Sequence, residues 1–519
     1  MSVKSEALIL DEATQEGRNI RLEHRRTPEL VVAFIGPVGS GVTESNRIFE
    51  EILEKEYGYK GFYYKVSDII RNSAKFVEID LNVELSGSER IKQFQKAGND
   101  LRKKFGDDYL SRKCIDLIAQ NRLAHGGYKR EKNEKKEETL IPQPMRFVHL
   151  IDALKHPEEL KLLRAVYGDL MTLVGVFAPV DVRRDRLLKN GIDRSELDKI
   201  ISTDEHEEII HGQKVRETFS NSDLFIRNDK DNDYELRQRI GRYLELIFGV
   251  EIHTPTRDEM AMYNAASAAS KSACMSRQVG ATIYSKSGEL IGIGWNDVPK
   301  KGGALYSAED GRNDQRCYLW GGKICHNDDR KNKLYEKILI ELKKEKIISG
   351  KAAESERVYS ALMRTDIRNL IEYSRSIHAE MEAIISVGRS SKAGLVGSTL
   401  YSSTFPCHSC ARHIVAAGID KVVYIEPYPK SLAKELHSDA LSDSSKDEHT
   451  KVVFEQFDGV APKNVMKFFR SGIDRKKNGK KIMRGKRLAT PVFQPALDSF
   501  TIYEQRVVEE LHEAEKSAS

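Results

Sequence analysis

The feature that most constrains the fold of this chain is an apolar run that ends in a glycine-rich turn. Residues 29–35 (ELVVAFI) form the run, GPVGSGVT follows at 36–43, and a helical pattern continues to about Lys55. A short continuous apolar run is typical of a strand that is buried on both faces of a sheet. A strand, a tight turn and a helix in this order predict the first segment of an α/β unit.

The residues that follow repeat this alternation of strands and helices. Helix-like stretches separate four further predicted strands, at 61–69, 146–152, 171–177 and 223–228. Strands that alternate with helices predict a doubly wound parallel sheet. Within this unit, residues 129–138 hold nine charges of both signs, so the stretch from Tyr128 to Pro144 is predicted to be a solvated loop.

A second α/β unit is predicted after a helix at 233–248, which ends with Gly249. Its predicted strands lie at 279–284, 290–295, 398–403, 421–426 and 451–457. Its predicted helices lie at 257–274, 377–387, 407–417 and 430–441. This order predicts an α/β/α sandwich. A long insertion at about 300–370 contains an amphipathic pattern at 328–346, which predicts one more helix.

The second unit contains a set of residues with the character of metal ligands. His378-Ala-Glu380 and Pro406-Cys407-His408-Ser409-Cys410 each fall at the predicted start of a helix. His378, Cys407 and Cys410 supply one imidazole and two thiolates. Zinc held by three protein ligands keeps a fourth position open for water, which is the catalytic arrangement, whereas structural sites usually take all four ligands from the chain. The positive ends of the two helices favour ionised thiolates.

Zinc in this setting predicts hydrolytic chemistry. Bound zinc lowers the pKa of its water from about 15.7 toward about 7, which supplies a nucleophile at neutral pH. Glu380 lies two residues from His378 and is predicted to carry protons without binding the metal. The two motifs resemble the zinc deaminase signature H-x-E…P-C-x-x-C, and on that template the hydroxide attacks C4 of a cytosine. A structural zinc site remains the alternative interpretation.

The glycine-rich turn of the first unit resembles a phosphate-binding P-loop, G-x-x-x-x-G-K-[ST]. Its candidate nucleotide-binding residues are Gly36, Gly39, Ser40, Gly41, Val42 and Thr43. Backbone amides can cradle phosphate, and Thr43 is placed to reach a Mg²⁺ ion bound with the nucleotide. Val42 stands where the lysine belongs, so phosphoryl transfer is predicted to be severely weakened and nucleotide sensing is favoured.

Two further features resemble nucleotide kinases of the P-loop class. Asp152 ends a predicted strand where an acid that supports a metal would fall, and Arg183, Arg184 and Arg186 resemble a lid helix. A helix cap and a solvated helix face are the alternatives. The resulting division of the chain is a polar lead-in (1–27), a P-loop kinase-like domain (28–250), a deaminase-like domain (251–472) and a basic tail with a terminal helix (473–519).

A second group of soft ligands lies in the insertion. Cys317, Cys325 and His326 fall within ten residues and are candidates for a structural zinc site, although a fourth ligand is missing. The alternative is a buried cysteine pair near Trp320. The two remaining cysteines, Cys114 and Cys274, are predicted to lie in the core on helices.

Composition narrows the location and the partners. The longest apolar stretches, LVVAFIG and LMTLVGVFAPV, are far below the roughly 18 residues that span a bilayer, so no membrane partner is expected. Six cysteines in 519 residues, two of them in a C-x-x-C motif, favour a reducing cytoplasm over a secreted disulfide framework. The net charge is only +5, but residues 475–487 hold eight cations and no acid. This basic segment is interpreted either as an RNA-binding element or as a solvated tail.

The two halves together resemble the anti-phage dCTP deaminases of bacteria, in which a degenerate P-loop kinase-like half is fused to a deoxycytidylate deaminase half. The phrases FIGPVGSGVT, HLIDALKHPEE, RDEMAMYNAASAAS, HAEMEAI and FPCHSCARHIVAAGIDKVVYIEPYPKS carry the resemblance, which covers roughly residues 28–470. MSRQVGATI at 275–283 and GIGWNDVP at 292–299 are similar to the first two strands of the cytidine/deoxycytidylate deaminase fold.

The resemblance implies conversion of dCTP and dCMP to dUTP and dUMP, which depletes a precursor of phage DNA. It also implies a regulatory RNA for some members and a sugar contact from Asn296, for which a turn-forming role is the alternative. A homo-oligomer is expected. Two other functions remain open at this stage: a polynucleotide deaminase that flips a base from RNA or single-stranded DNA, and a nucleotide- or RNA-binding regulator with structural zinc.

Overall fold

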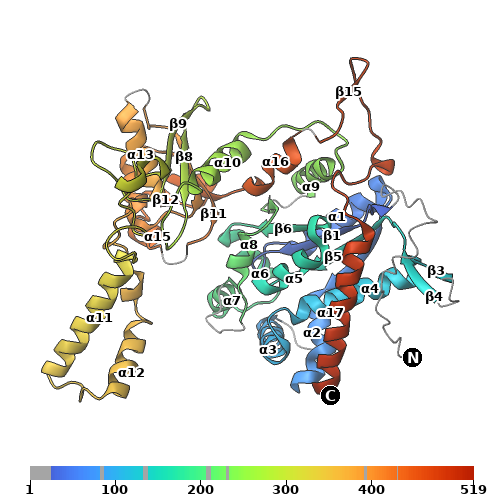
Figure 1. Cartoon of the computed structure of the whole chain (residues 1–519), viewed down its shortest axis with the longest axis horizontal. Helices are drawn as coiled ribbons and strands as arrows, with labels where there is room; N and C mark the ends of the chain where they lie inside the picture. Colours follow the sequence, from blue (N-terminus) through green and yellow to red (C-terminus); the bar gives the residue numbers. More distant parts are fainter. Residues whose placement is uncertain are drawn as a thin grey trace.

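Two six-stranded sheets carry the fold, and helices cover both of them (Figure 1). The computed structural model describes residues 25–81, 87–132, 138–205, 212–229, 233–390, 394–428, 431–470 and 472–518. Within these residues, none of the helices combines the length and the apolar composition that crossing a bilayer requires.

The first sheet is a parallel sheet, as predicted. Its parallel strands are β1 (Leu30–Ile35), β2 (Lys60–Lys65), β5 (Phe147–Asp152), β6 (Met171–Phe177) and β7 (Leu224–Arg227). They lie in the order β7-β6-β1-β5-β2, so the chain first winds to one side of β1 and then to the other. Ligands of open α/β sheets bind where the winding direction changes, outside the carboxyl ends of the strands. In this sheet that position is the end of β1.

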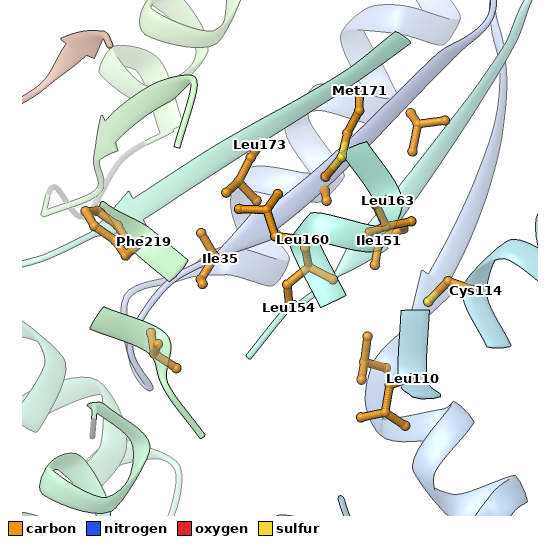
Figure 2. Packing of buried hydrophobic residues seen from close by; sticks show 14 of the residues in the cluster. Ile35, Leu110, Cys114, Ile151, Leu154, Leu160, Leu163, Met171, Leu173 and Phe219 are labelled. Carbon is orange, nitrogen blue, oxygen red and sulfur yellow. The ribbon is translucent and has the colours of Figure 1, made fainter. Parts of the chain in front are cut away.

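Successive residues of β1 enter two different core clusters, which explains why the strand is apolar throughout. Val31, Ala33 and Ile35 pack on one face, with α4 (Tyr109–Ala124) and α5 (Pro157–Tyr167). Figure 2 shows Ile35, Ile151 and Leu173 of the sheet beside Leu154, Leu160 and Leu163. Leu30, Val32 and Phe34 pack on the opposite face, with α1 (Val42–Tyr57) and α9 (Asp233–Phe248). Helices on both faces confirm the doubly wound arrangement.

Two predictions for the first unit were wrong in detail. The strand predicted at 61–69 ends at Lys65, because α2 (Val66–Ser73) begins there and buries Val66, Ile69 and Ile70. The stretch predicted to be a loop forms a hairpin of β3 (Tyr128–Lys132) and β4 (Glu138–Pro142), whose antiparallel pairing satisfies the backbone groups that a loop would leave to water. Residues 133–137 lie outside the described residues. The other helices of this unit are α3 (Gly87–Phe105), α6 (Val180–Lys189), α7 (Leu197–Glu205) and α8 (Val215–Phe219).

The second sheet has the order β12-β13-β11-β10-β8-β9. Its strands are β8 (Gly280–Tyr284), β9 (Leu290–Trp295), β10 (Thr399–Thr404), β11 (Lys421–Glu426), β12 (Leu441–Ser442) and β13 (Val452–Gln456). The helices α13 (Ala379–Ser390) and α14 (His408–Ala416) pack on one face, and α10 (Arg257–Ala269) packs on the other. These layers confirm the predicted α/β/α sandwich.

Two predicted helices of this unit are shorter in the structure. The helix predicted at 257–274 ends at Ala269. Cys274 therefore lies in the connection between α10 and β8, where it is half-buried, and not in the core on a helix. The helix predicted at 430–441 is reduced to α15 (Ala433–Leu436), because the chain turns there to enter β12. The insertion contains α11 (His326–Lys344), close to its predicted range, and α12 (Ala352–Leu362), which project together from the sheet (Figure 1).

The C-terminal part of the chain returns to the first sheet. After β13, β14 (Gly459–Val460) pairs antiparallel with β7, and α16 (Val465–Phe469) follows. The basic segment forms a small hairpin of β15 (Lys476–Lys477) and β16 (Lys480–Lys481). The last helix, α17 (Leu497–Ala518), lies in the tail, where a terminal helix was predicted, and runs along α4 (Figure 1). The division of the chain at residue 250 stays a prediction. Residues after 456 belong to the second predicted domain but pair with the first sheet, since β14 joins β7.

Candidate functional site

The first half of the site is the start of α13. His378 immediately precedes this helix and Glu380 lies in its first turn. The helix packs directly on β9 because Gly294 has no side chain: a Cβ there would lie 2.3 Å from the carbonyl oxygen of Ala379. The backbone N–H of Ile377 donates to the carbonyl of Asp297, 3.0 Å away, and this bond fixes the entry to the helix.

The second half is the start of α14, which follows β10. Cys407 is the N-cap residue, and its sulfur accepts a hydrogen bond from the backbone N–H of Cys410 at 3.4 Å. Both cysteines are buried. The N-terminal ends of α13 and α14 therefore converge, and their partial positive charges favour thiolates at this point.

The three predicted ligands meet around one point. The Nδ1 atom of His378 lies 3.4 Å from the sulfur of Cys407 and 3.3 Å from the sulfur of Cys410. Tetrahedral zinc with Zn–S of about 2.3 Å and Zn–N of about 2.0 Å requires N···S separations of roughly 3.5 Å. The donor set and its spacing therefore fit zinc. Within the described part of the chain, this is the one cluster of at least three such donors that lie within 4.8 Å of one another.

Hydrogen bonds lower the pKa of one group of the site, and burial raises the pKa of another. The Cys410 side chain and His378 hydrogen bond to Cys407 and lower the pKa of its thiol to about 4. Burial raises the pKa of Glu380 above its usual value. Glu380 is 4% exposed, and its Oε2 atom lies 3.5 Å from the sulfur of Cys410. The carboxyl group thus lies beside the metal ligands.

These residues line a cavity of about 230 Å³. His378, Glu380 and Cys407 form part of its wall, and the aromatic rings of Phe405 and Tyr428 form another part. Arg277 and Arg375 also line it and bring two cations to the site. The cavity therefore combines metal ligands, an acid, aromatic faces and cations, which suits an anionic ligand with an aromatic ring.

Asn296 also lines this cavity, but both ends of its side-chain amide are hydrogen bonded to backbone groups of the chain. Its Oδ1 accepts from the N–H of Val279 at 2.7 Å, and its Nδ2 donates to the carbonyl of Arg277 at 2.8 Å. The side chain therefore shapes the turn before β8. A contact between Asn296 and a sugar stays a prediction.

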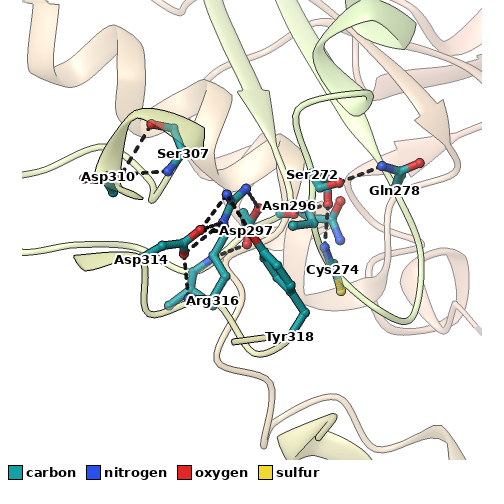
Figure 3. Close-up of polar contacts among 12 residues, drawn as sticks. Ser272, Cys274, Gln278, Asn296, Asp297, Ser307, Asp310, Asp314, Arg316 and Tyr318 are labelled. Carbon is teal, nitrogen blue, oxygen red and sulfur yellow. Dashed lines mark hydrogen bonds and ion pairs between the residues drawn. The ribbon is translucent and has the colours of Figure 1, made fainter. Parts of the chain in front are cut away.

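Sequence reasoning missed several residues that shape the site. Asp297 is buried and accepts a hydrogen bond from the N–H of Ala273 at 2.9 Å. Arg316 forms a bidentate contact with Asp314, and its guanidinium also lies 3.6 Å from the carboxylate of Asp297 (Figure 3). Arg375 lies over the ring of Trp320 at 4.0 Å. The only signal in the sequence was the position of Arg375 three residues before His378.

The predicted second metal site is not assembled in the structure. The sulfur of Cys325 contacts Ser276 Oγ at 3.5 Å, the sulfur of Cys317 accepts from Arg375 at 3.8 Å, and the His326 ring packs against Trp320. The three groups line the same cavity but have separate partners. In the described residues, they are not among the groups of donors that lie within 4.8 Å of one another. The prediction for Cys114 is confirmed, since it is buried on α4.

The P-loop-like turn lies between β1 and α1, at the change of winding direction. Gly39 and Gly41 have φ of +81° and +83°, which other residues rarely adopt. Thr43 Oγ1 donates to Asp152 Oδ2 at 2.8 Å. Of the three predicted lid arginines, Arg186 reaches the carbonyl of Gly39 at 3.3 Å, Arg184 pairs with Asp198 at the surface, and Arg183 is buried.

Comparison with known proteins places the second unit. Residues 255–426 match the family described as "Cytidine and deoxycytidylate deaminase zinc-binding region". The deoxycytidylate deaminase of Enterobacteria phage T2 is 30% identical over 167 residues, which cover 31% of this chain and 75% of that protein. That of phage T4 is 30% identical over 169 residues, covering 31% and 73%. The crystal structure of the dCMP deaminase from cyanophage S-TIM5 aligns with 40% of this chain and 100% of its own, at 17% identity and a TM-score of 0.22.

Proposed function

Because the chain belongs to the cytidine and deoxycytidylate deaminase family, we propose that it hydrolyses deoxycytidine nucleotides, converting dCTP, dCMP or both to the uracil nucleotides and ammonia. The single observation that carries the proposal is the position of Glu380 beside the His378, Cys407 and Cys410 cluster, inside one cavity. A metal site with three protein ligands and a buried acid next to it is the arrangement of a catalytic and not a structural zinc.

Each residue of the cluster has a distinct part in the proposed reaction. His378, Cys407 and Cys410 would hold zinc, which supplies an activated water at neutral pH when it is bound. Glu380 would accept a proton from that water through Oε2, pass it to N3 of the base and then assist the departure of ammonia. The family resemblance implies that Asn296 contacts the sugar. Arg277 and Arg375 line the cavity and would contact a phosphate of the substrate.

Regulation through the first unit is part of the proposal. A cavity of about 290 Å³ lies between the two sheets, with Pro37 of the P-loop-like turn on one side. Phe405 and Tyr428 line this cavity and also the cavity of the zinc site. A ligand or a movement at the turn would therefore meet side chains that shape the substrate cavity.

The remaining parts of the proposal come from the sequence. The family resemblance implies depletion of dCTP in anti-phage defence and a regulatory RNA. Cysteine usage favours a cytoplasmic location, and the P-loop-like turn predicts Mg²⁺ with a nucleotide at Thr43. A homo-oligomer is also expected. The exposed lysines of the β15–β16 hairpin support RNA binding by the basic segment.

The basic segment at 475–487 gives less support to the alternative function, deamination of a polynucleotide. Lys481 pairs with Glu251, and Lys486 contacts Glu56 at 2.9 Å and Glu245 at 3.1 Å. The segment is thus held by Glu56 and Glu245 of the first unit and by Glu251, which directly follows that unit. It does not line the cavity of the zinc site.

A product assay tests the substrate. We expect purified chain to form uracil from dCTP, dCMP or both, and to leave a cytosine-containing oligonucleotide unchanged. CTP and CMP should react more slowly if the site distinguishes deoxyribose from ribose. Chain stripped of zinc is the control and should form no product. Uracil that appears only in the oligonucleotide would contradict the proposal.

A further inference from the structure

The P-loop-like turn lacks its own lysine, but the structure brings another one to it. Val42, at the lysine position, packs against the apolar core cluster of the first unit. Lys155 reaches the turn from the connection between β5 and α5, and its Nζ donates to the carbonyl of Gly36 at 3.3 Å. Gly36 is the first residue of the turn. An ammonium group therefore lies at the turn although the motif has lost its cation.

The connection that carries Lys155 is fixed at several points. The N–H of Leu154 donates to the carbonyl of Phe34, at the end of β1, at 2.9 Å. The N–H of Lys155 donates to Glu159 Oε2 at 2.9 Å, and Glu159 is itself held by Arg102 through a buried ion pair of 2.7 Å. Hydrogen bonds thus hold the backbone around Lys155 in place, and the residue is only partly exposed.

The turn itself has the character of an anion site. Helix α1 begins at Val42, and its N-cap residue Gly41 offers no side-chain cap, so the first amides of the helix are not satisfied by a capping side chain. The hydroxyl of Ser40 is fully buried and has no hydrogen-bond partner among the residues that the structure describes. Arg186 donates to the carbonyl of Gly39 at 3.3 Å, and Thr43 and Asp152 are hydrogen bonded across the turn. Two cations, helix amides and a buried hydroxyl therefore surround one short loop.

We propose that Lys155 replaces the missing P-loop lysine and that the turn, Lys155 and Arg186 together bind the polyphosphate chain of a nucleotide. Lys155 and Arg186 now donate to loop carbonyls, and phosphate oxygens are stronger acceptors for both cations. Helix amides at an N-terminus add to the attraction for phosphate. This site is separate from the zinc cluster. The inference rests on the proposed nucleotide site at Thr43 and deepens it by naming the two cations that would hold the phosphates.

Calorimetric titration of the full-length chain with ATP and with inorganic tripolyphosphate, each with and without MgCl₂, tests this inference. Lys155→Met should weaken binding of both probes about 10- to 100-fold, because a hydrogen bond to a charged group is lost. Lys161→Met is the matched control: it removes an exposed lysine of α5 that pairs with Glu158, and it should leave binding within about 2-fold. Val42→Lys added to Lys155→Met should restore binding.

Equal affinity of Lys155→Met and Lys161→Met would overturn the inference, and so would the absence of binding by the wild-type chain in all conditions. Melting temperatures of the two variants within a degree or so of each other show that the fold is unchanged. The deamination assay separates this proposal from the proposed function. A chain that binds tripolyphosphate without deaminating nucleotides contradicts only the latter, and a chain that deaminates without binding contradicts only the former.

Discussion

Replacing Glu380 with glutamine is expected to lower the rate of deamination by about 10²- to 10⁴-fold, the range that general acid–base groups contribute. Glutamine keeps the shape of the side chain but can neither accept a proton from water nor deliver one to the base. Because Glu380 is not one of the three donors that fit zinc, the variant should retain its metal. The measurement is the initial rate of ammonia release, made with zinc content and melting temperature on the same sample.

Glu382→Gln is the matched control for this experiment. Glu382 is also a buried glutamate of α13, but it pairs with Arg389 and does not line the cavity. We expect its zinc content and its rate to stay close to those of the wild type. If Glu380→Gln deaminated as fast as Glu382→Gln, Glu380 would not be the proton carrier.

Replacing Arg122 with methionine is expected to lower the free energy of unfolding by about 3–5 kcal/mol, because it leaves two buried carboxylates without their partner. Arg122 is fully buried on α4 and joins three distant parts of the chain. Its Nη2 lies 2.8 Å from Glu29 Oε2, before β1, and its Nη1 pairs with Glu504 on α17. The Phe500 ring of α17 packs on the guanidinium at 5.1 Å. The ion network thus fastens the C-terminal helix to the first sheet.

Urea unfolding measures this effect, with limited proteolysis to detect release of α17. Arg112→Met is the control on the same helix. Arg112 is 26% exposed in its ion pair with Asp108, so its loss should cost only about 0–1 kcal/mol. A triple variant that also carries Glu29→Gln and Glu504→Gln should recover part of the lost stability, because no unpaired charge remains. Equal losses in Arg122→Met and Arg112→Met would contradict the proposed role of the network.

Local patterns in the sequence were sufficient to predict the framework of both sheets and the metal ligands. The strands β1, β6 and β9 were predicted to within one residue, because each is a short apolar or alternating run with turn residues at its ends. The cluster of His378, Cys407 and Cys410 could be predicted because both motifs begin helices that follow strands or turns of one sheet.

What the sequence did not predict depends on contacts between distant residues. The return of β14 to the first sheet joins Val460 to Leu224, and no local pattern encodes a two-residue strand. The cavity walls at Phe405 and Tyr428 and the approach of Lys155 to Gly36 arise from packing of separate elements. Spacing in the sequence also could not show that Cys317, Cys325 and His326 line one cavity. In the described residues their donor atoms are not grouped within 4.8 Å of one another, and a second metal at them stays a prediction.

Zinc content and ammonia release, measured in one preparation, test whether a zinc site carries the deamination. We expect one zinc per chain in the wild type, deamination of dCTP or dCMP in proportion to the zinc content, and loss of both zinc and activity in Cys407→Ser. A zinc-free chain that deaminates at the wild-type rate, or a zinc-loaded chain that deaminates no cytosine nucleotide, would contradict this expectation.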